Sequence, residues 1–371
     1  MGASILMGMQ YGAKDYKTLE RQVSTTLLSG VVFSVFIAIL CILFARPILI
    51  FLQVDSSILD IAVEYMRIVF CGLIFTYLYN FFSSTMRALG DSMASLYFLM
   101  ISAIINILGD LFFVCILHWN SAGCALATVI SEAISAVCCV IYIQWKVPTL
   151  QLGRKWLVFD KHLFKKTISY GWASAMQQAT VQLGKIGVQA IVNTMGVSMA
   201  AAFAVVNRID DFAIMPEQNI AHAMTALMAQ NRGAGKLDRM KKGFWSGLML
   251  ECIYGLTMTV ICFWFARPLM MLFTKEKGVI LHGVTYLKLI AVIYVVPGIT
   301  NGLQGYFRGI WEMKVTLLSS FTNMGLRVLA VAVFVLVLDI EMEAIPMAYL
   351  IGWIGMTVVE LPLLMKNMKR T

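Results

Sequence analysis

Ten runs of about twenty or more mostly apolar residues follow one another along the 371-residue chain, separated by short segments that carry most of its charge. A run of this length spans the bilayer as one α-helix. The runs are continuous rather than alternating, which excludes a closed β-barrel. The segment Met1–Tyr11 has the character of the last turns of an eleventh helix. The pattern predicts an all-α polytopic membrane protein with spans at 23–45, 62–87, 93–117, 122–145, 167–195, 200–231, 244–265, 282–307, 315–338 and 344–366.

The composition agrees with this interpretation. Hydrophobic residues make up 60% of the chain and charged residues only 13%, whereas soluble domains carry about 25% charged residues. The mean hydropathy is +0.81. We therefore expect the lipid bilayer to be the chain's principal surroundings.

The net charge of +9 does not indicate nucleic-acid binding, because the basic residues follow the loops of a membrane protein. Twenty of them lie in one set of alternate loops and in the C-terminal tail. The other set holds four, which are Arg46, Arg267, Lys275 and Lys277. Loops rich in Lys and Arg stay in the cytoplasm. The charges therefore predict a multi-pass protein of the cell membrane with a cytoplasmic C-terminus.

The chain repeats itself at an offset of 221 residues without an insertion. Phe44–Pro47 (FARP) returns as Phe265–Pro268, and Asn80 and Arg87 fall on Asn301 and Arg308. A repeat of this length indicates a duplicated domain. Six predicted helices separate the loops after Gly12 and Gly233, and both loops are predicted to be cytoplasmic. The two lobes are therefore expected to be parallel repeats about an axis along the membrane normal.

The repeat divides the chain into an N-lobe at 1–145, a cytoplasmic linker at 146–166 and a C-lobe at 167–371. The apolar stretch Ile168–Gly196 and most of Ala200–Ala229 have no counterpart in the first copy. We therefore expect six helices in the C-lobe. The N-lobe is expected to lack its first helix and most of its second, so that it holds a remnant of helix 2 followed by helices 3–6.

The eight cysteines do not suggest a metal site or a cofactor. Nearly all lie within apolar spans, they form no Cys-x-x-Cys pair, and the four histidines do not cluster with them. A structural or catalytic metal would need converging thiolates or imidazoles. We expect these cysteines to be packing residues.

Several motifs resemble those of the multidrug and toxic compound extrusion (MATE) transporters. They are Gln10–Ala13, Gln230–Gly235, Met86–Asp91, Asn106–Asp110 and Gly123–Ser131. The resemblance covers essentially the whole chain. It implies two six-helix lobes that alternate between inward-open and outward-open states and export organic cations and other amphiphiles against an inward gradient of Na⁺ or H⁺.

Asp110 is the most informative polar residue. It lies four positions after Asn106, on the same face of one predicted helix. A carboxylate within a span costs at least ~2.5 kcal/mol and usually handles ions or protons. By resemblance, Asn106, Asp110 and Thr128 fall on the family's N-lobe cation site, although the first-helix aspartate that completes that site is absent and Leu111 stands where the family often has Pro. The alternative is that Asp110 reaches the outer interface near His118.

Further intramembrane polar residues are candidates for a substrate cavity. They are Glu132, Gln178, Gln182, Asp210 and Asp211. Asp210 and Asp211 point about 100° apart on a helix, so that one can face a cavity while the other pairs with Arg208. Met215-Pro216 is expected to kink or break the same helix. Internal ion pairing and helix packing remain an alternative for this set.

Four hypotheses remain for the function. The resemblance favours a cation-coupled antiporter, expected to act as a monomer, with Na⁺ or H⁺ as the coupling ion and an amphiphilic or cationic small molecule as substrate. A lipid-linked oligosaccharide flippase of the related superfamily would need more intramembrane Arg and Lys than the scattered set seen here. A membrane enzyme would need a catalytic cluster, and the sequence shows none. An inactive fragment of a transporter is the fourth.

Overall fold

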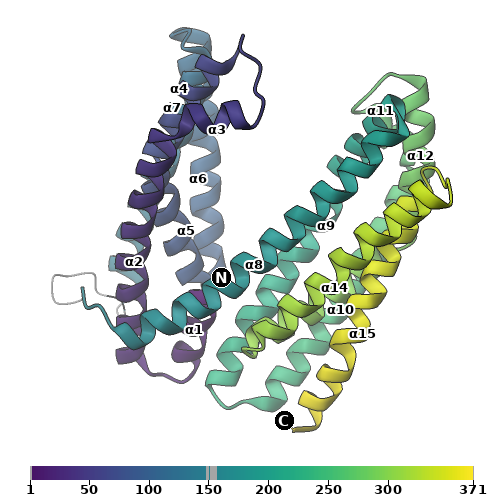
Figure 1. Ribbon diagram of the computed structural model, residues 1–371. Helices are drawn as coiled ribbons and strands as arrows, with labels where there is room; N and C mark the ends of the chain where they lie inside the picture. The colour runs from purple at the N-terminus through teal and green to yellow at the C-terminus, as the bar shows by residue number, and fades with distance from the viewer. Residues whose placement is uncertain (1, 148–149, 151–156, 371) are drawn as a thin grey trace. The chain divides into compact units, whose positions relative to one another are not determined.

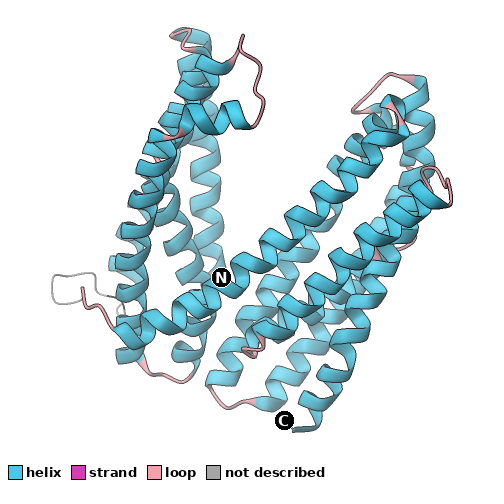
Figure 2. Ribbon diagram, in the orientation of Figure 1, coloured by secondary structure: helices cyan, strands magenta, loops and turns pink. Residues whose placement is uncertain are grey.

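The computed structural model describes residues 2–147, 150 and 157–370, and within these ranges the regular structure is entirely helical (Figure 2). The chain divides into two compact units, Met1–Ile168 and Ser169–Thr371. The linker predicted at 146–166 falls partly on residues 148–149 and 151–156, which lie outside the described residues. Its last part is helical, because α8 begins at Lys161.

Unit 1 is built from short and long helices that Figure 1 labels in chain order. The long helix α6 continues into a π-helical segment, η1. The elements are α1 (Gly2–Gly12), α2 (Tyr16–Leu43), α3 (Ala45–Phe51), α4 (Leu59–Cys71), α5 (Leu73–Ala88), α6 (Ser92–Asp110), η1 (Leu111–Ile116), α7 (Asn120–Lys146) and the first residues of α8.

Unit 2 contains most of α8 and every later element. Its helix α14 also continues into a π-helical segment, η5. The elements are α8 (Lys161–Val192), η4 (Asn193–Met195), α9 (Val197–Gly233), α10 (Leu237–Trp264), α11 (Ala266–Met271), α12 (Lys277–Ala291), α13 (Val295–Gly309), α14 (Met313–Ala332), η5 (Val333–Val337) and α15 (Ala344–Arg370).

The 221-residue repeat reappears in the local structure of the two units. Helices α2 and α10 begin and end at positions related by that offset. The π-helical segments η1 and η5 correspond in the same way to within a residue. The left-handed backbone positions also pair, in the couples Lys14 and Gly235, Gly90 and Trp311, and His118 and Asp339. A duplicated sequence has therefore produced duplicated helices, breaks and turns.

Two of the predicted spans are bent rather than straight. The run 62–87 forms α4 and α5, which meet at 46°, and the run 282–307 forms α12 and α13, which meet at 52°. Gly72 at the first break lies against α7, where a Cβ atom would come within 2.3 Å of Val129. At the second break, Pro297 in the first turn of α13 has no N–H to continue the ladder from α12. Each of these two predicted spans is therefore a bent pair of helices rather than one straight helix.

The ten predicted spans are not equally apolar. Among the described residues, six helices are long and apolar enough to cross a membrane, or eight if each bent pair is one span. Helices α8 and α9 have 32 and 37 residues, and they are less apolar than these six because polar residues interrupt them. Pro216 lies inside α9 and does not break it. The chain is nevertheless a multi-pass membrane protein.

Three clusters of buried apolar side chains form the cores within the two units. One cluster lies in unit 1 and includes Met7, Phe82 and Met86. The other two lie in unit 2. These clusters position the helices that carry the buried polar residues.

Candidate cation site and buried carboxylates

The predicted cation site in unit 1 is formed by α6 and α7, which pack closely. Gly109 makes this possible, because a Cβ atom there would lie 2.9 Å from the Cβ of Ala127. One turn away, the Asn106 side-chain amide donates a hydrogen bond to the Thr128 hydroxyl at 3.3 Å. The Thr128 hydroxyl in turn donates to the carbonyl oxygen of Cys124 at 3.0 Å. The structure therefore brings together two of the three residues predicted from the sequence.

Asp110 completes the group from the last residue of α6. Its Oδ1 atom is buried and has no hydrogen-bond partner in the described part of the chain. Its carboxyl group lies beside the Cys124 thiol, which places it next to the Asn106–Thr128 contact. Directly after Asp110 the helix widens into η1, and such π-helical segments are frequent at functional sites.

Glu132 extends this polar face by one turn along α7. Its Oε2 atom accepts a short hydrogen bond from the Thr76 hydroxyl on α5. The Asn80 side chain donates to the carbonyl oxygen of Thr76 at 2.8 Å. Glu132 is therefore part of a connection between α5 and α7 on the same side of α7 as Thr128.

The acidic pair of α9 in unit 2 is split between two environments. Asp210 is buried, and it accepts a short hydrogen bond from the Tyr294 hydroxyl. Asp211 is exposed, and it forms a salt bridge of 3.6 Å with Lys185 on α8. The pairing with Arg208 that the sequence suggested is replaced by this bridge, because Lys185 comes from the neighbouring helix.

The glutamines of α8 do not all point the same way. Gln178 and Gln182 are exposed. Gln177, which directly precedes Gln178, donates to Gln304 at 2.6 Å and to Ser320 at 3.1 Å. Gln177 is therefore held inside unit 2, whereas the other two glutamines remain available on the surface of the unit.

Unit 2 carries different chemistry at the positions that match the unit 1 site. Arg327 falls on Asn106 of the repeat, and its guanidinium lies 3.8 Å from the ring centroid of Tyr349 and 5.1 Å from that of Trp353. Tyr349 and Trp353 are the counterparts of Thr128 and Glu132. A cation stacked on aromatic rings thus stands where unit 1 has an amide, a hydroxyl and a carboxylate.

The structure also buries three glutamates in unit 2. Glu217, Glu251 and Glu360 are all at most 1% exposed. Glu360 accepts hydrogen bonds from Gln304 at 2.5 Å and from Ser319 at 2.7 Å. Each of the three stands within or beside a long apolar run, which was the signal available in the sequence.

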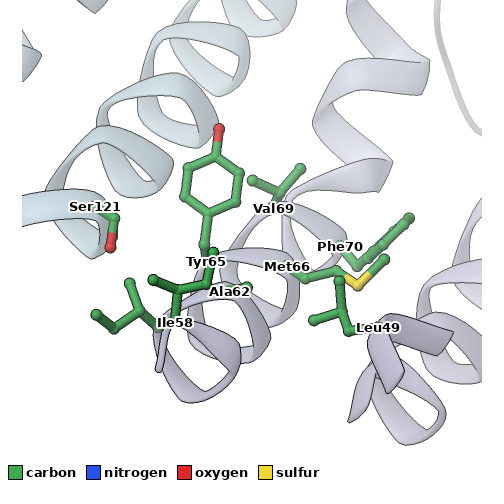
Figure 3. A pocket seen from close by; sticks show the side chains of 9 residues that line it. Leu49, Ile58, Ala62, Tyr65, Met66, Val69, Phe70 and Ser121 are labelled. Carbon is green, nitrogen blue, oxygen red and sulfur yellow. The ribbon is translucent and has the colours of Figure 1, made fainter. Parts of the chain in front are cut away.

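A separate apolar pocket of about 530 Å³ lies between α3, α4 and the start of α7 (Figure 3). Leu49, Ile58, Met66 and Phe70 contribute to its wall, and the Tyr65 hydroxyl and Ser121 are its polar groups. Its lining includes none of the predicted site residues. The pocket is therefore distinct from the polar face of α6 and α7.

Long apolar helices with polar groups gathered at their contacts define a polytopic membrane protein. The family model MatE matches residues 1–112 and 173–333. The chain belongs to the MatE family. This confirms the resemblance of its motifs to the MATE transporters, a family of transporters rather than of enzymes.

Curated relatives support the same assignment. The probable multidrug resistance protein YoeA of Bacillus subtilis is 30% identical over 285 residues, which cover 74% of this chain and 61% of YoeA. The probable multidrug resistance protein NorM of Thermotoga maritima is 24% identical over 361 residues, covering 96% of this chain and 76% of NorM. The chain therefore spans about three fifths of the length of YoeA.

Solved structures show the same fold. A MOP superfamily transporter from Pyrococcus furiosus, described as having a binding pocket of reverse polarity, matches all of this chain and 84% of its own with a TM-score of 0.92. The outward-facing conformation of a multidrug resistance MATE family transporter matches the same shares with a TM-score of 0.93. Both are 18% identical to this chain.

Proposed function

We propose that this chain acts in cation-coupled export, in which Na⁺ or H⁺ entering the cell through unit 1 drives an amphiphilic, cationic small molecule outward. The observation that carries this proposal is the Asp110 carboxyl group beside the contact between Asn106 and Thr128. Alternating access between the two lobes would couple the inward movement of the ion to the outward movement of the substrate.

The chemistry of the three residues suits a small cation. They offer a carboxylate, an amide oxygen and a hydroxyl, all of which are oxygen ligands. A buried carboxylate oxygen without a donor is costly, and a bound proton or Na⁺ removes that cost. The group is only partly buried, which leaves a route for exchange. We infer that the coupling ion binds at Asp110 and that this binding step couples transport to the Na⁺ or H⁺ gradient.

The substrate side of the proposal rests on exposed polar groups and on the relatives. Asp211, Gln178 and Gln182 are exposed on α8 and α9, and Glu132 adds a carboxylate in unit 1. Carboxylates and amides among apolar helix surfaces suit amphiphilic cations. Asp210 is a weaker candidate for substrate binding, since its carboxylate already accepts a hydrogen bond from the Tyr294 hydroxyl. The names of the relatives describe multidrug resistance proteins, which fits a broad substrate class.

The proposal includes a location and an orientation. The distribution of Lys and Arg among the loops supports a cell-membrane protein with a cytoplasmic C-terminus. We propose that one chain is the working unit, with no resident cofactor.

The experiment is efflux of a fluorescent organic cation such as ethidium from proteoliposomes that contain this chain. An imposed Na⁺ or H⁺ gradient should drive efflux, and replacing Na⁺ by choline at constant pH identifies the coupling ion. Asp110→Asn should abolish gradient-driven efflux while ethidium binding in detergent, measured by fluorescence anisotropy, is kept. Glu64→Gln, at an exposed carboxylate of α4, is the matched control. Unchanged efflux in Asp110→Asn, or no gradient-driven efflux by the wild-type chain, would overturn the proposal.

A further inference from the structure

Two fully buried glutamates lie on the packed helices α9 and α10 of unit 2, and neither belongs to the predicted cation site of unit 1. Glu217 is 1% exposed and Glu251 is 0% exposed. Glu217 stands in the buried stripe of α9, between Ala213 and Ala221. Glu251 stands in the buried stripe of α10, between Phe244 and Gly255. Both side chains reach adjacent residues of α13, because Glu217 hydrogen-bonds to Asn301 and the Cγ atom of Glu251 lies beside Gly302. The charge of Glu217 therefore acts on Glu251.

Helix α13 packs closely against Glu251 of α10 through two glycines. A Cβ atom on Gly298 would lie 3.2 Å from the carbonyl oxygen of Glu251, and one on Gly302 would lie 3.7 Å from its Cγ. On α10, a Cβ atom on Gly255 would come within 2.9 Å of the Cα of Val295. Three glycines thus let α10 and α13 pack closely beside Glu251, and larger residues would push the two helices apart.

Only part of the hydrogen-bonding capacity of the two carboxyl groups is used. Asn301 on α13 hydrogen-bonds to the Glu217 carboxyl group. Glu217 Oε2 and both oxygens of Glu251 are buried and have no hydrogen-bond partner within the described ranges. Two adjacent buried carboxylates without a proton or cation would carry a large desolvation cost in addition to their repulsion.

We propose that Glu217 and Glu251 form a second cation site, in which the two carboxyl groups share one exchangeable proton. Glu251 carries the proton and donates it toward Glu217 Oε2, and Glu217 remains the anion, stabilised by Asn301. One proton thereby supplies the donor for Glu217 Oε2 and neutralises Glu251. Loading and release change only the O–H bond of Glu251, and the proton passes to or from water.

The surroundings of the pair contain further titratable groups that a pH experiment must consider. Cys252 and Tyr254 flank Glu251 on α10 and interact with the charges of the pair. Other titratable groups on the helices that pack around the pair include Asp210, Asp211 and His222 on α9, Tyr306 and Arg308 on α13, and Tyr286 and Lys288 on α12.

Infrared difference spectroscopy of the purified chain tests this proposal, because a protonated carboxyl group has its own C=O stretching band. The wild-type chain should show a band that disappears when the pH is raised and shifts in D₂O. Glu251→Gln should lose it. Glu217→Gln should keep the band but lower the proton affinity of Glu251 by about tenfold or more, because a neighbouring negative charge is removed. Glu64→Gln should leave the band unchanged.

Three results would overturn the proposal. They are the absence of a pH-dependent carboxyl band in the wild-type chain, a band that survives in Glu251→Gln, and a band that Na⁺ removes at constant pH. The last would assign the pair to Na⁺ instead. If Glu251→Gln does not yield a monodisperse protein, the shift in Glu217→Gln decides the question.

A role of this proton in transport rests on the proposed function, whereas proton sharing itself does not. Asp110→Asn should keep the band even where it abolishes efflux. The two proposals therefore fail by different measurements.

Discussion

Arg327 of unit 2 stands where Asn106 stands in unit 1. The two residues are 221 positions apart, on helices α14 and α6 whose first residues, Met313 and Ser92, are separated by the same offset. Asn106 donates to Thr128 on the next long helix, and Arg327 stacks on Tyr349, the counterpart of Thr128. Val331 replaces Asp110. Unit 2 thus holds a fixed positive charge at the position where unit 1 is proposed to bind a mobile one.

Arg327→Met should destabilise unit 2. The guanidinium is buried, and a desolvated cation–π contact contributes about 2 kcal/mol. Its charge also compensates that of Asp210, which would lose this compensation. We expect a lower midpoint of thermal unfolding in detergent, followed by tryptophan fluorescence.

Arg208→Met is the control for this change, because Arg208 is exposed on α9. Adding Asp210→Asn to Arg327→Met should recover part of the lost stability. Equal unfolding midpoints for Arg327→Met and Arg208→Met would show that Arg327 is not a structural cation.

Gly109→Ala should weaken the cation site of unit 1 without altering any of its ligands. The new Cβ atom would lie 2.9 Å from the Cβ of Ala127, which cannot rotate away, so α6 and α7 must separate. The contact between Asn106 and Thr128 would then lengthen. We expect cation affinity to fall about tenfold, which corresponds to about 1.4 kcal/mol, in a titration of the purified chain.

Gly171→Ala serves as the comparison, since no atom outside its own helical turn lies within 4 Å of a Cβ atom at Gly171 among the described residues. It should bind the cation as the wild-type chain does. An unchanged cation affinity in Gly109→Ala would show that cation binding does not depend on the close contact between α6 and α7.

The sequence predicted the helical runs and the repeat well, because both depend on apolar length and on local residue identity. It did not predict the breaks at Gly72 and before Val295. The break at Gly72 lies at a contact with another helix, through Val129 on α7, which no local pattern contains. The second break had a local signal in Pro297, which apolar length alone does not reveal.

The candidate site was predictable to a similar degree. Asn106 and Thr128 could be selected because the resemblance fixed their helices, and the structure joins them. Glu251 could not be ranked from sequence, because a single glutamate in an apolar run is compatible with either face of the helix. Its importance arises from Glu217 and the glycines of α13, which come from other helices.

Tyr294→Phe should lower the stability of unit 2, because it removes a hydrogen-bond donor from the buried Asp210 carboxylate. The Tyr294 hydroxyl donates to Asp210, and this aspartate is 5% exposed. Leaving a buried acceptor without its donor costs about 1–3 kcal/mol, so unfolding in detergent should occur at a lower temperature. Tyr65→Phe, at an exposed tyrosine, should have little effect. A similar stability for both variants would indicate that Asp210 has another donor.

Asp15→Ala should loosen the first turn of α2. The Asp15 carboxylate accepts a hydrogen bond from the Thr18 amide at 3.1 Å and caps the helix. Lys236, its counterpart before α10, makes no side-chain cap, so Lys236→Ala is a matched control within the same chain. Loss of such a cap costs about 1 kcal/mol. Hydrogen exchange should therefore accelerate at the start of α2 in Asp15→Ala, and exchange in α10 should be unchanged in Lys236→Ala.

The same cap should depend on pH. The hydrogen bonds from Thr18 lower the pKa of Asp15, so folding favours the charged form of the carboxyl group. The stabilisation is fully present above the unfolded pKa of about 3.9, and it is lost as the pH falls through the lower folded value. The difference in exchange between the wild-type chain and Asp15→Ala should therefore be present at neutral pH and shrink in acid. A difference that stays constant down to the lowest pH at which the chain is folded would show that the carboxylate charge contributes nothing to the cap.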